Sequence, residues 1–326
     1  MADRGLALRD RLLVEAVALA YIVLAAGLHG WHYLLFPGLA ALSYDVLTRP
    51  WGKWAGQPGR LLVTPVAGAV IGVLVTRMLP FGVAAILLIV IPCVLLLALL
   101  KSTVAPGIAA GALPLFLGIK SWLYPASIAV SLIVLVAILL PWQRLCRRKY
   151  PDADVLTPSV DDVLESPATG TAWILPFFVF VTVMALCATA VGLRLILFPP
   201  LIVIAYEMFA HPTTCPWAGK PVALPGVCVL NAVAGWGAVG LFGRGAIAAA
   251  CAMALGIVAL RLLRLRMPPA LAVGLLPLVI DSPSIKFPIS VAIGAGALTL
   301  AYQFHQRWVT GQGRAGQSVP NNTRSG

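Results

Sequence analysis

The fold class is decided by residues 82–100, GVAAILLIVIPCVLLLALL, which carry no charged side chain over nearly the length that a helix needs to cross a bilayer. Residues 121–140 and 172–193 are equally free of charge, and residues 12–28 contain a single acid, Glu15. None of these stretches alternates strictly between apolar and polar residues, as a strand of a membrane barrel does. They therefore predict membrane-spanning helices, whose backbone polar groups are satisfied within the segment.

The composition of the whole chain favours the same prediction. Of its 326 residues, 60% are hydrophobic and only 10% are charged, whereas a soluble domain carries about 25% charged residues. The lipid bilayer is therefore the main partner that we expect. The 23 Lys and Arg residues outnumber the 11 Asp and Glu residues. They are scattered between apolar stretches, so the sequence does not predict the basic surface of a nucleic-acid-binding protein.

The chain contains one pattern twice, at a nearly constant offset. The clearest match is the loop sequence WAGQP at 54–58, which returns as WAGKP at 217–221. Further matches keep the same order in both halves: Phe36-Pro37 with Phe198-Pro199, Tyr44-Asp45 with Tyr206-Glu207, Arg49-Pro50 with His211-Pro212, Leu99-Leu100-Lys101 with Leu262-Leu263-Arg264, and Leu113-Pro114-Leu115 with Leu276-Pro277-Leu278. The sequence thus predicts two copies of one membrane unit.

Each unit is predicted to contain about four full transmembrane helices and two shorter apolar segments. The shorter segments are residues 36–47 and 105–118 in the first unit, and 198–209 and 268–280 in the second. They contain Pro or Gly and are too short to cross a membrane alone, so we expect re-entrant or broken helices. The predicted fold is an all-α polytopic membrane protein with two parallel repeats.

The charge of the segments that flank the units predicts their orientation. Basic residues lie at the N-terminus, between the units and near the C-terminus: Arg4, Arg9, Arg11; Arg144, Arg147, Arg148, Lys149; Arg307, Arg314, Arg324. Because such flanks remain in the cytoplasm, we expect all three on the cytoplasmic side of the cell (inner) membrane. The predicted divisions are the first unit at 1–140, a polar linker at 141–170, the second unit at 171–308 and a disordered tail at 309–326.

Both units resemble the HPP family of integral membrane proteins. The resemblance rests on the two loop sequences and on Met267-Pro268-Pro269-Ala270, with Ala105-Pro106-Gly107 at the corresponding place in the first unit. The histidine of the family motif is replaced by Met267 in one copy and by Val104 in the other. The resemblance implies membrane transport, with nitrite as a substrate of some members, but any role of the motif histidine has no counterpart in this chain.

Basic residues near the short segments are candidates for binding an anion. A cation near the start of a broken helix adds to the attraction of the exposed N–H groups and of the positive end of the helix dipole. The predicted substrate-binding residues are Lys101, Arg77, Pro106 and Gly107 in the first unit, and Arg264, Arg244, Pro268 and Pro269 in the second. The alternative is that these bases lie at the membrane surface and only set the orientation of the chain.

Asp45 and Glu207 are the acids that recur in both units, four residues before Arg49 and His211 respectively. A partly buried carboxylate at such a place would suit proton coupling. We favour the simpler interpretation, which is pairing with the neighbour at i+4. Glu15 has no acidic counterpart in the second unit, and we expect it at the interfacial end of the first helix.

Motifs of enzymes and of cofactor sites are missing from the sequence. It contains no phosphate-binding Gly-rich loop, H-E-x-x-H motif or nucleophile elbow. Its six cysteines form no C-x-x-C pair, and His29 and His32 have no further metal ligands nearby in sequence. We therefore expect neither enzymatic activity nor a cofactor or metal.

The predicted function is a transporter or channel for a small inorganic or organic anion, with its site between the two units. Homo-oligomerisation is left open by the sequence. The alternative function is a membrane scaffold or accessory subunit, in which the polar linker would bind a cytoplasmic partner.

Overall fold

The computed structural model describes residues 6–28, 33–150, 170–211, 215, 217, 220 and 222–317, and all regular structure in these ranges is helical. The first half contains α1 (Leu8–Gly27), α2 (Gly38–Thr48), α3 (Pro58–Met78), α4 (Val83–Leu99), α5 (Pro106–Leu117) and α6 (Leu123–Lys149). The second half contains α8 (Ile174–Val191), the 3-10 helix η2 (Arg194–Leu197), α9 (Pro199–Ala210), α10 (Ala223–Phe242), α11 (Ala246–Leu262), α12 (Pro269–Val279) and α13 (Lys286–Gln317). Most of the predicted linker, the end of the tail, and His29 with His32 lie outside the described residues.

Five of the described helices are long and apolar enough to cross a membrane, namely α3, α6, α8, α10 and α13 up to Arg307. Shorter apolar helices accompany them, including α4 and α11 with 17 residues each. Large apolar side chains point outward along these helices, as Leu175 does with 73% of its surface exposed. An apolar surface of this extent suits lipid and not water. The chain is a multi-pass, all-α membrane protein, as the sequence predicts.

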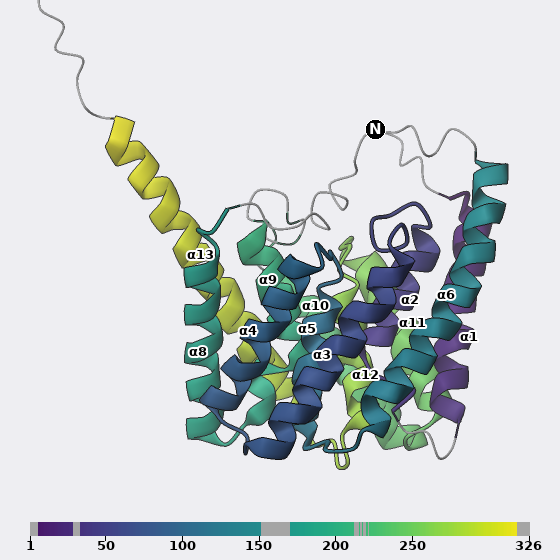
Figure 1. Cartoon of the computed structure of the whole chain (residues 1–326), viewed down its shortest axis with the longest axis horizontal. Helices are drawn as coiled ribbons and strands as arrows, with labels where there is room; N and C mark the ends of the chain where they lie inside the picture. Colours follow the sequence, from purple (N-terminus) through teal and green to yellow (C-terminus); the bar gives the residue numbers. More distant parts are fainter. Residues whose placement is uncertain are drawn as a thin grey trace, which may run out of the picture.

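The short helices α2, α5, α9 and α12 lie inside the molecule, with the long helices around them (Figure 1). Every residue of α9 is buried, and α5 and α12 are buried except for their last residues. α5 packs against α9, and α12 packs against α2. Each half of the chain therefore supplies short helices that are packed against those of the other half.

The short helix α5 is not re-entrant, because the chain that contains it continues from one edge of the molecule to the other. At one edge, Arg60 Nη1 at the start of α3 donates to the Lys101 carbonyl oxygen after α4 at 2.8 Å. At the opposite edge, the turn between α3 and α4 and Gly118 at the end of α5 line one cavity. The chain from residue 102 to 118 thus spans the molecule as a buried coil followed by a short helix.

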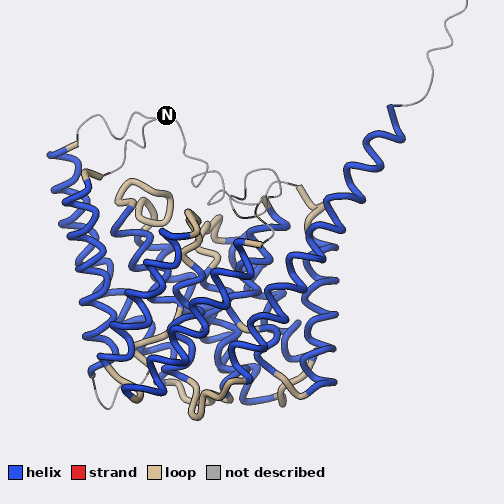
Figure 2. Tube along the Cα trace, turned by 180° about the vertical axis from the view of Figure 1, so that it is seen from behind, coloured by secondary structure: helices blue, strands red, loops and turns tan. Residues whose placement is uncertain are grey.

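The two halves end at the same edge of the molecule. Lys149 Nζ at the end of α6 lies 2.6 Å from Asp10 Oδ2 near the start of α1. Views from the front and from behind show α13 extending past this same edge (Figure 1 and Figure 2). An even number of crossings in each half accounts for this arrangement.

Glycines bring the short helices into contact with the long ones. A Cβ atom at Gly72 of α3 would overlap the Gly111 carbonyl oxygen of α5, and a Cβ atom at Gly235 of α10 would overlap the Gly274 carbonyl oxygen of α12. Such close approach is typical of small residues at membrane helix interfaces. It is this packing that keeps α5 and α12 within the protein and away from lipid.

Replacing Gly235 by Ala should destabilise the protein, because the added methyl group has to displace the backbone of α12. We expect the free energy of unfolding to fall by about 1–3 kcal/mol. Gly240 is the matched control, since it lies on the same helix and a Cβ atom there meets nothing within 4 Å. Thermal unfolding of the purified protein in detergent compares the two variants, and equal midpoints would contradict the packing role of Gly235.

Candidate functional site

The starts of α2 and α9 meet α5 at the centre of the molecule. Pro37 and Gly38 at α2, and Pro199 and Pro200 at α9, line a cavity together with Phe36, Ala109, Ala110 and Leu113. The cavity measures about 10 Å³, which is about the room that one water molecule needs. Two helix N-termini, each the positive end of a helix dipole, thus face a small apolar space that is closed to larger solutes in this structure.

Lys101 and Arg264, predicted to bind substrate, lie at the edge of the molecule and end α4 and α11. Both have positive φ, 47° and 48°. The amide of Ser102 donates to the Leu97 carbonyl at 2.8 Å, and that of Leu265 donates to the Leu260 carbonyl at 3.0 Å. These bonds define the same Schellman cap in both halves, with a base where glycine is usual. Neither base lines the central cavity.

The prolines and the glycine predicted for the site form the first turns of the short helices. Pro106 and Gly107 begin α5 and are buried, and a Cβ atom at Gly107 would lie 2.8 Å from Cγ2 of Thr64. Pro269 begins α12 and is buried, while Pro268 is half-buried. These residues set where each short helix starts and how closely it packs, and the central cavity lies one turn further along α5.

Arg77 and Arg244 lie at the edge opposite to Lys101 and Arg264. Arg77 lines a cavity of about 330 Å³ together with Lys120 and Arg194. Arg244 Nη1 donates to Asp281 Oδ1 at 3.1 Å. The two arginines therefore differ in their surroundings, because Arg77 lies among other bases and Arg244 forms an ion pair.

Asp45 and Glu207 are both buried, with 2% and 6% of their surfaces exposed. Arg49 Nε donates to Asp45 Oδ1 at 3.1 Å, which confirms the predicted pairing at i+4 in the first half. In the second half, the His211 amide donates to the Glu207 carbonyl at 3.1 Å. Both acids lie in the last turns of α2 and α9, away from the central cavity.

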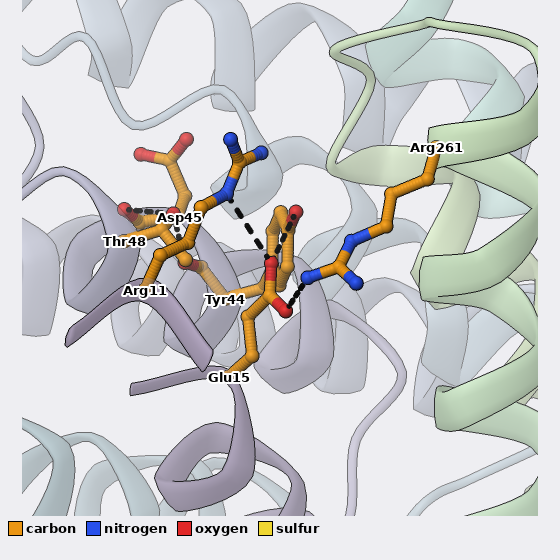
Figure 3. A network of polar contacts seen from close by, with 6 residues as sticks. All are labelled: Arg11, Glu15, Tyr44, Asp45, Thr48 and Arg261. Carbon is orange, nitrogen blue, oxygen red and sulfur yellow. Dashed lines mark hydrogen bonds and ion pairs between the residues drawn. The ribbon is translucent and has the colours of Figure 1, made fainter. Parts of the chain in front are cut away.

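A polar network around Glu15 was not predicted from the sequence, and it joins the two halves (Figure 3). Arg11 Nε lies 3.5 Å from Glu15 Oε1, the Tyr44 hydroxyl donates to the same oxygen at 3.5 Å, and Arg261 of α11 pairs with Oε2. The Glu15 side chain is 7% exposed. It is therefore buried between α1, α2 and α11, where three partners replace the water around it.

The equivalent place in the other half holds aromatic rings instead of charges. Trp173, Phe177 and Tyr206 occupy the positions of Arg11, Glu15 and Tyr44. The Trp173 and Tyr206 ring centroids are 5.3 Å apart, and those of Phe177 and Tyr206 are 6.0 Å apart. Ala98 takes the place of Arg261. One signal in the sequence could have revealed the network. The second half lacks an acid at the position of Glu15, and the first half lacks a base at the position of Arg261.

The described residues contain no group of three or more His, Cys, Asp or Glu side chains that could hold a metal ion. At the centre of the molecule, the described residues provide helix dipoles in an apolar setting. At the edges they provide exposed cations.

Replacing Glu15 by Gln should lower the free energy of unfolding by about 2 kcal/mol, because a neutral amide leaves Arg261 without its carboxylate. Replacing Arg261 by Ala as well should restore part of the loss, since the equivalent contact between α8 and α4 already combines Phe177 with Ala98. A double-mutant cycle on thermal unfolding measures the coupling between the two residues. Strictly additive effects would contradict a direct interaction, and Arg147→Ala at the exposed end of α6 serves as the control.

Comparison with known proteins assigns no family to this chain. No family model matches the chain, and no curated protein and no solved structure matches it. The resemblance to the HPP family therefore rests on the sequence motifs alone, and this chain is described by what its own residues show: a multi-pass helical membrane protein with short helices buried at its centre.

Proposed function

We propose that this chain is a transporter or channel for a small inorganic or organic anion, with the path between two parallel repeats. The observation that carries the proposal is the burial of four short helices, α2, α5, α9 and α12, at the centre of the molecule. Membrane proteins interrupt helices at membrane depth where the interruption is enclosed by protein or lines a path for polar solutes. A purely structural bundle would need no such interruption.

The meeting point of α2 and α9 favours an anion over a cation, because both helices direct their N-termini toward it. Pro199 and Pro200 lack N–H groups, so the first turn of α9 offers its dipole without hydrogen-bond donors at these two positions. An anion would therefore be attracted but held weakly. Passage through a membrane needs this balance, since a solute that binds too tightly cannot leave.

The exposed bases at the two edges support the same choice of solute. Lys101 and Arg264 lie at one edge, and Arg77 and Arg244 lie at the other. Cations at the mouth of a path raise the local concentration of anions and the rate at which they enter. In this proposal the four bases guide anions toward the path, and Pro106, Gly107, Pro268 and Pro269 fix the short helices that line it.

Movement between the halves would open the path. α5 packs against α9 and α12 against α2, so a small rotation of one half against the other would separate the helix starts around the central cavity. Rigid-body motion of repeats about a central site is common among transporters. Asp45 and Glu207 are the candidates for proton coupling, because they are buried at the ends of the two helices that would move.

The HPP resemblance suggests nitrite or an ion of similar size as the substrate. The basic flanks suggest that the N-terminus, the linker and the C-terminus lie in the cytoplasm, with the protein in the inner membrane. The short distance between the starts of α2 and α9 suits a small anion, since little space has to be created around the central cavity.

Uptake by proteoliposomes that contain the purified protein tests this function. We expect flux of nitrite, nitrate or a small carboxylate above that of empty liposomes. Replacing Lys101 and Arg264 together by Gln should lower the uptake rate at low substrate concentration by about tenfold, because the attraction at one mouth is lost. Arg147 and Arg148, exposed at the end of α6, provide a control pair whose replacement by Gln should leave the rate unchanged.

Two outcomes would contradict the proposal. Absence of flux for all three kinds of anion would remove the transport function. The second outcome concerns function in cells. If the Lys101 and Arg264 variant kept full function while deletion of residues 150–168 abolished it, the alternative function of a membrane scaffold would be favoured.

A further inference from the structure

A second cavity lies away from the central one, at the edge opposite to the start of α1. It measures about 330 Å³. The turn between α3 and α4 lines one side, the end of α5 with Lys120 lines another, and Arg194 of η2 closes it from the second half of the chain. We call this space the basic pocket and define it by Arg77, Gly118, Lys120 and Arg194.

The basic pocket contains three cations, and none of the described residues that line it is acidic. The Arg77 guanidinium lies 5.6 Å from the ring centroid of Trp122, and that of Arg194 lies 4.9 Å from the ring centroid of Phe81. Stacking on an aromatic face orients a guanidinium and leaves its N–H groups available along the plane. Two of the three cations are thus oriented at the pocket by aromatic rings.

A base at the corresponding edge of the second half is neutralised from within the chain. Arg244 lies in the turn after α10, at the position that Phe81 holds in the first half, and its Nη1 lies 3.1 Å from Asp281 Oδ1. Asp281 occupies the position equivalent to Gly118 in the repeat. The first half has Gly118 at the position of Asp281, so the described lining of the basic pocket supplies no carboxylate to the three bases, which favours an anion from outside the chain.

We propose that the basic pocket binds a phosphate group, either as part of an anionic phospholipid headgroup or as free phosphate. Two arginines and a lysine match an oxyanion with several acceptor oxygens, because guanidinium groups donate pairs of parallel hydrogen bonds. The volume exceeds what a nitrite-sized ion requires and is within the range of small-molecule sites. Met78, 80% exposed, and Trp122, 46% exposed, flank the pocket where the chains of a lipid would lie.

This inference does not rest on the proposed transport. The pocket lies at one edge of the molecule, whereas the proposed path runs through the centre, between α2, α5 and α9, and Arg77 is the one base that both proposals use. Binding can be measured without any flux, so failure of one proposal leaves the other open to its own test.

The test introduces into the first half the acid that the second half already has. Gly118→Asp places a carboxylate among the three bases, while Gly118→Asn has nearly the same shape and the same strain at φ 72° without the charge. We expect Gly118→Asp to weaken phosphate-group binding at least about tenfold relative to Gly118→Asn, because the carboxylate occupies the cations. Equal binding by the two variants would overturn the proposal.

A second pair of variants removes the bases instead. Arg194→Gln should weaken binding by about tenfold, whereas Arg244→Gln, whose cation is already paired, should leave it unchanged. This pair of variants still tests phosphate-group binding if Gly118→Asp fails to fold. Equal losses in both variants, or no loss in either, would overturn the proposal.

Two arms of the measurement identify the source of the phosphate. Native mass spectrometry of the full chain compares bound phosphatidylglycerol with phosphatidylcholine, and equilibrium binding of inorganic phosphate is measured in detergent without lipid. Preference for phosphatidylglycerol identifies a lipid headgroup, and saturable binding of inorganic phosphate identifies the free ion. If the wild-type protein shows neither, the pocket does not bind phosphate and the inference fails.

Discussion

Backbone groups at membrane depth need hydrogen-bond partners within the protein, and this requirement governs how the chain is arranged. Between α4 and α5 the chain leaves the helical conformation, so its polar groups have to be met by side chains. Trp54 Nε1 donates to the Thr103 carbonyl at 2.8 Å, and Thr64 Oγ1 donates to Ser102 Oγ at 2.8 Å. The loop that contains Trp54 thus has a physical role, because it covers the coil that leads into α5.

Once the coil is enclosed, the short helices have to pack closely, since any space around them would expose unpaired backbone to lipid. Gly72 against Gly111 and Gly235 against Gly274 bring the helix backbones together in both halves. The start of each short helix is then fixed by proline, at Pro106 in the first half. Enclosure, close packing and fixed starts together place the helix dipoles at the centre of the molecule.

The two halves share this scheme but differ where they meet the rest of the chain. Glu15 and Arg261 connect α1 with α11 by charge, whereas Phe177 packs with aromatic neighbours at the equivalent place. At the opposite edge, Arg244 is paired with Asp281 while Arg77 lies among further bases. The repeat determines the arrangement of the helices. The ion pairs and the cluster of bases lie at positions where the two copies have diverged.

The sequence by itself determined the helical membrane class and the presence of short apolar helices among the long ones, because these depend on local apolar length. It also predicted the pair formed by Asp45 and Arg49, which are neighbours on one helix turn. Only the tertiary structure decided that α5 crosses the molecule, that Arg261 reaches Glu15, and that Arg194 joins Arg77 and Lys120. These contacts link residues far apart in the chain, and no periodicity along one segment can specify them.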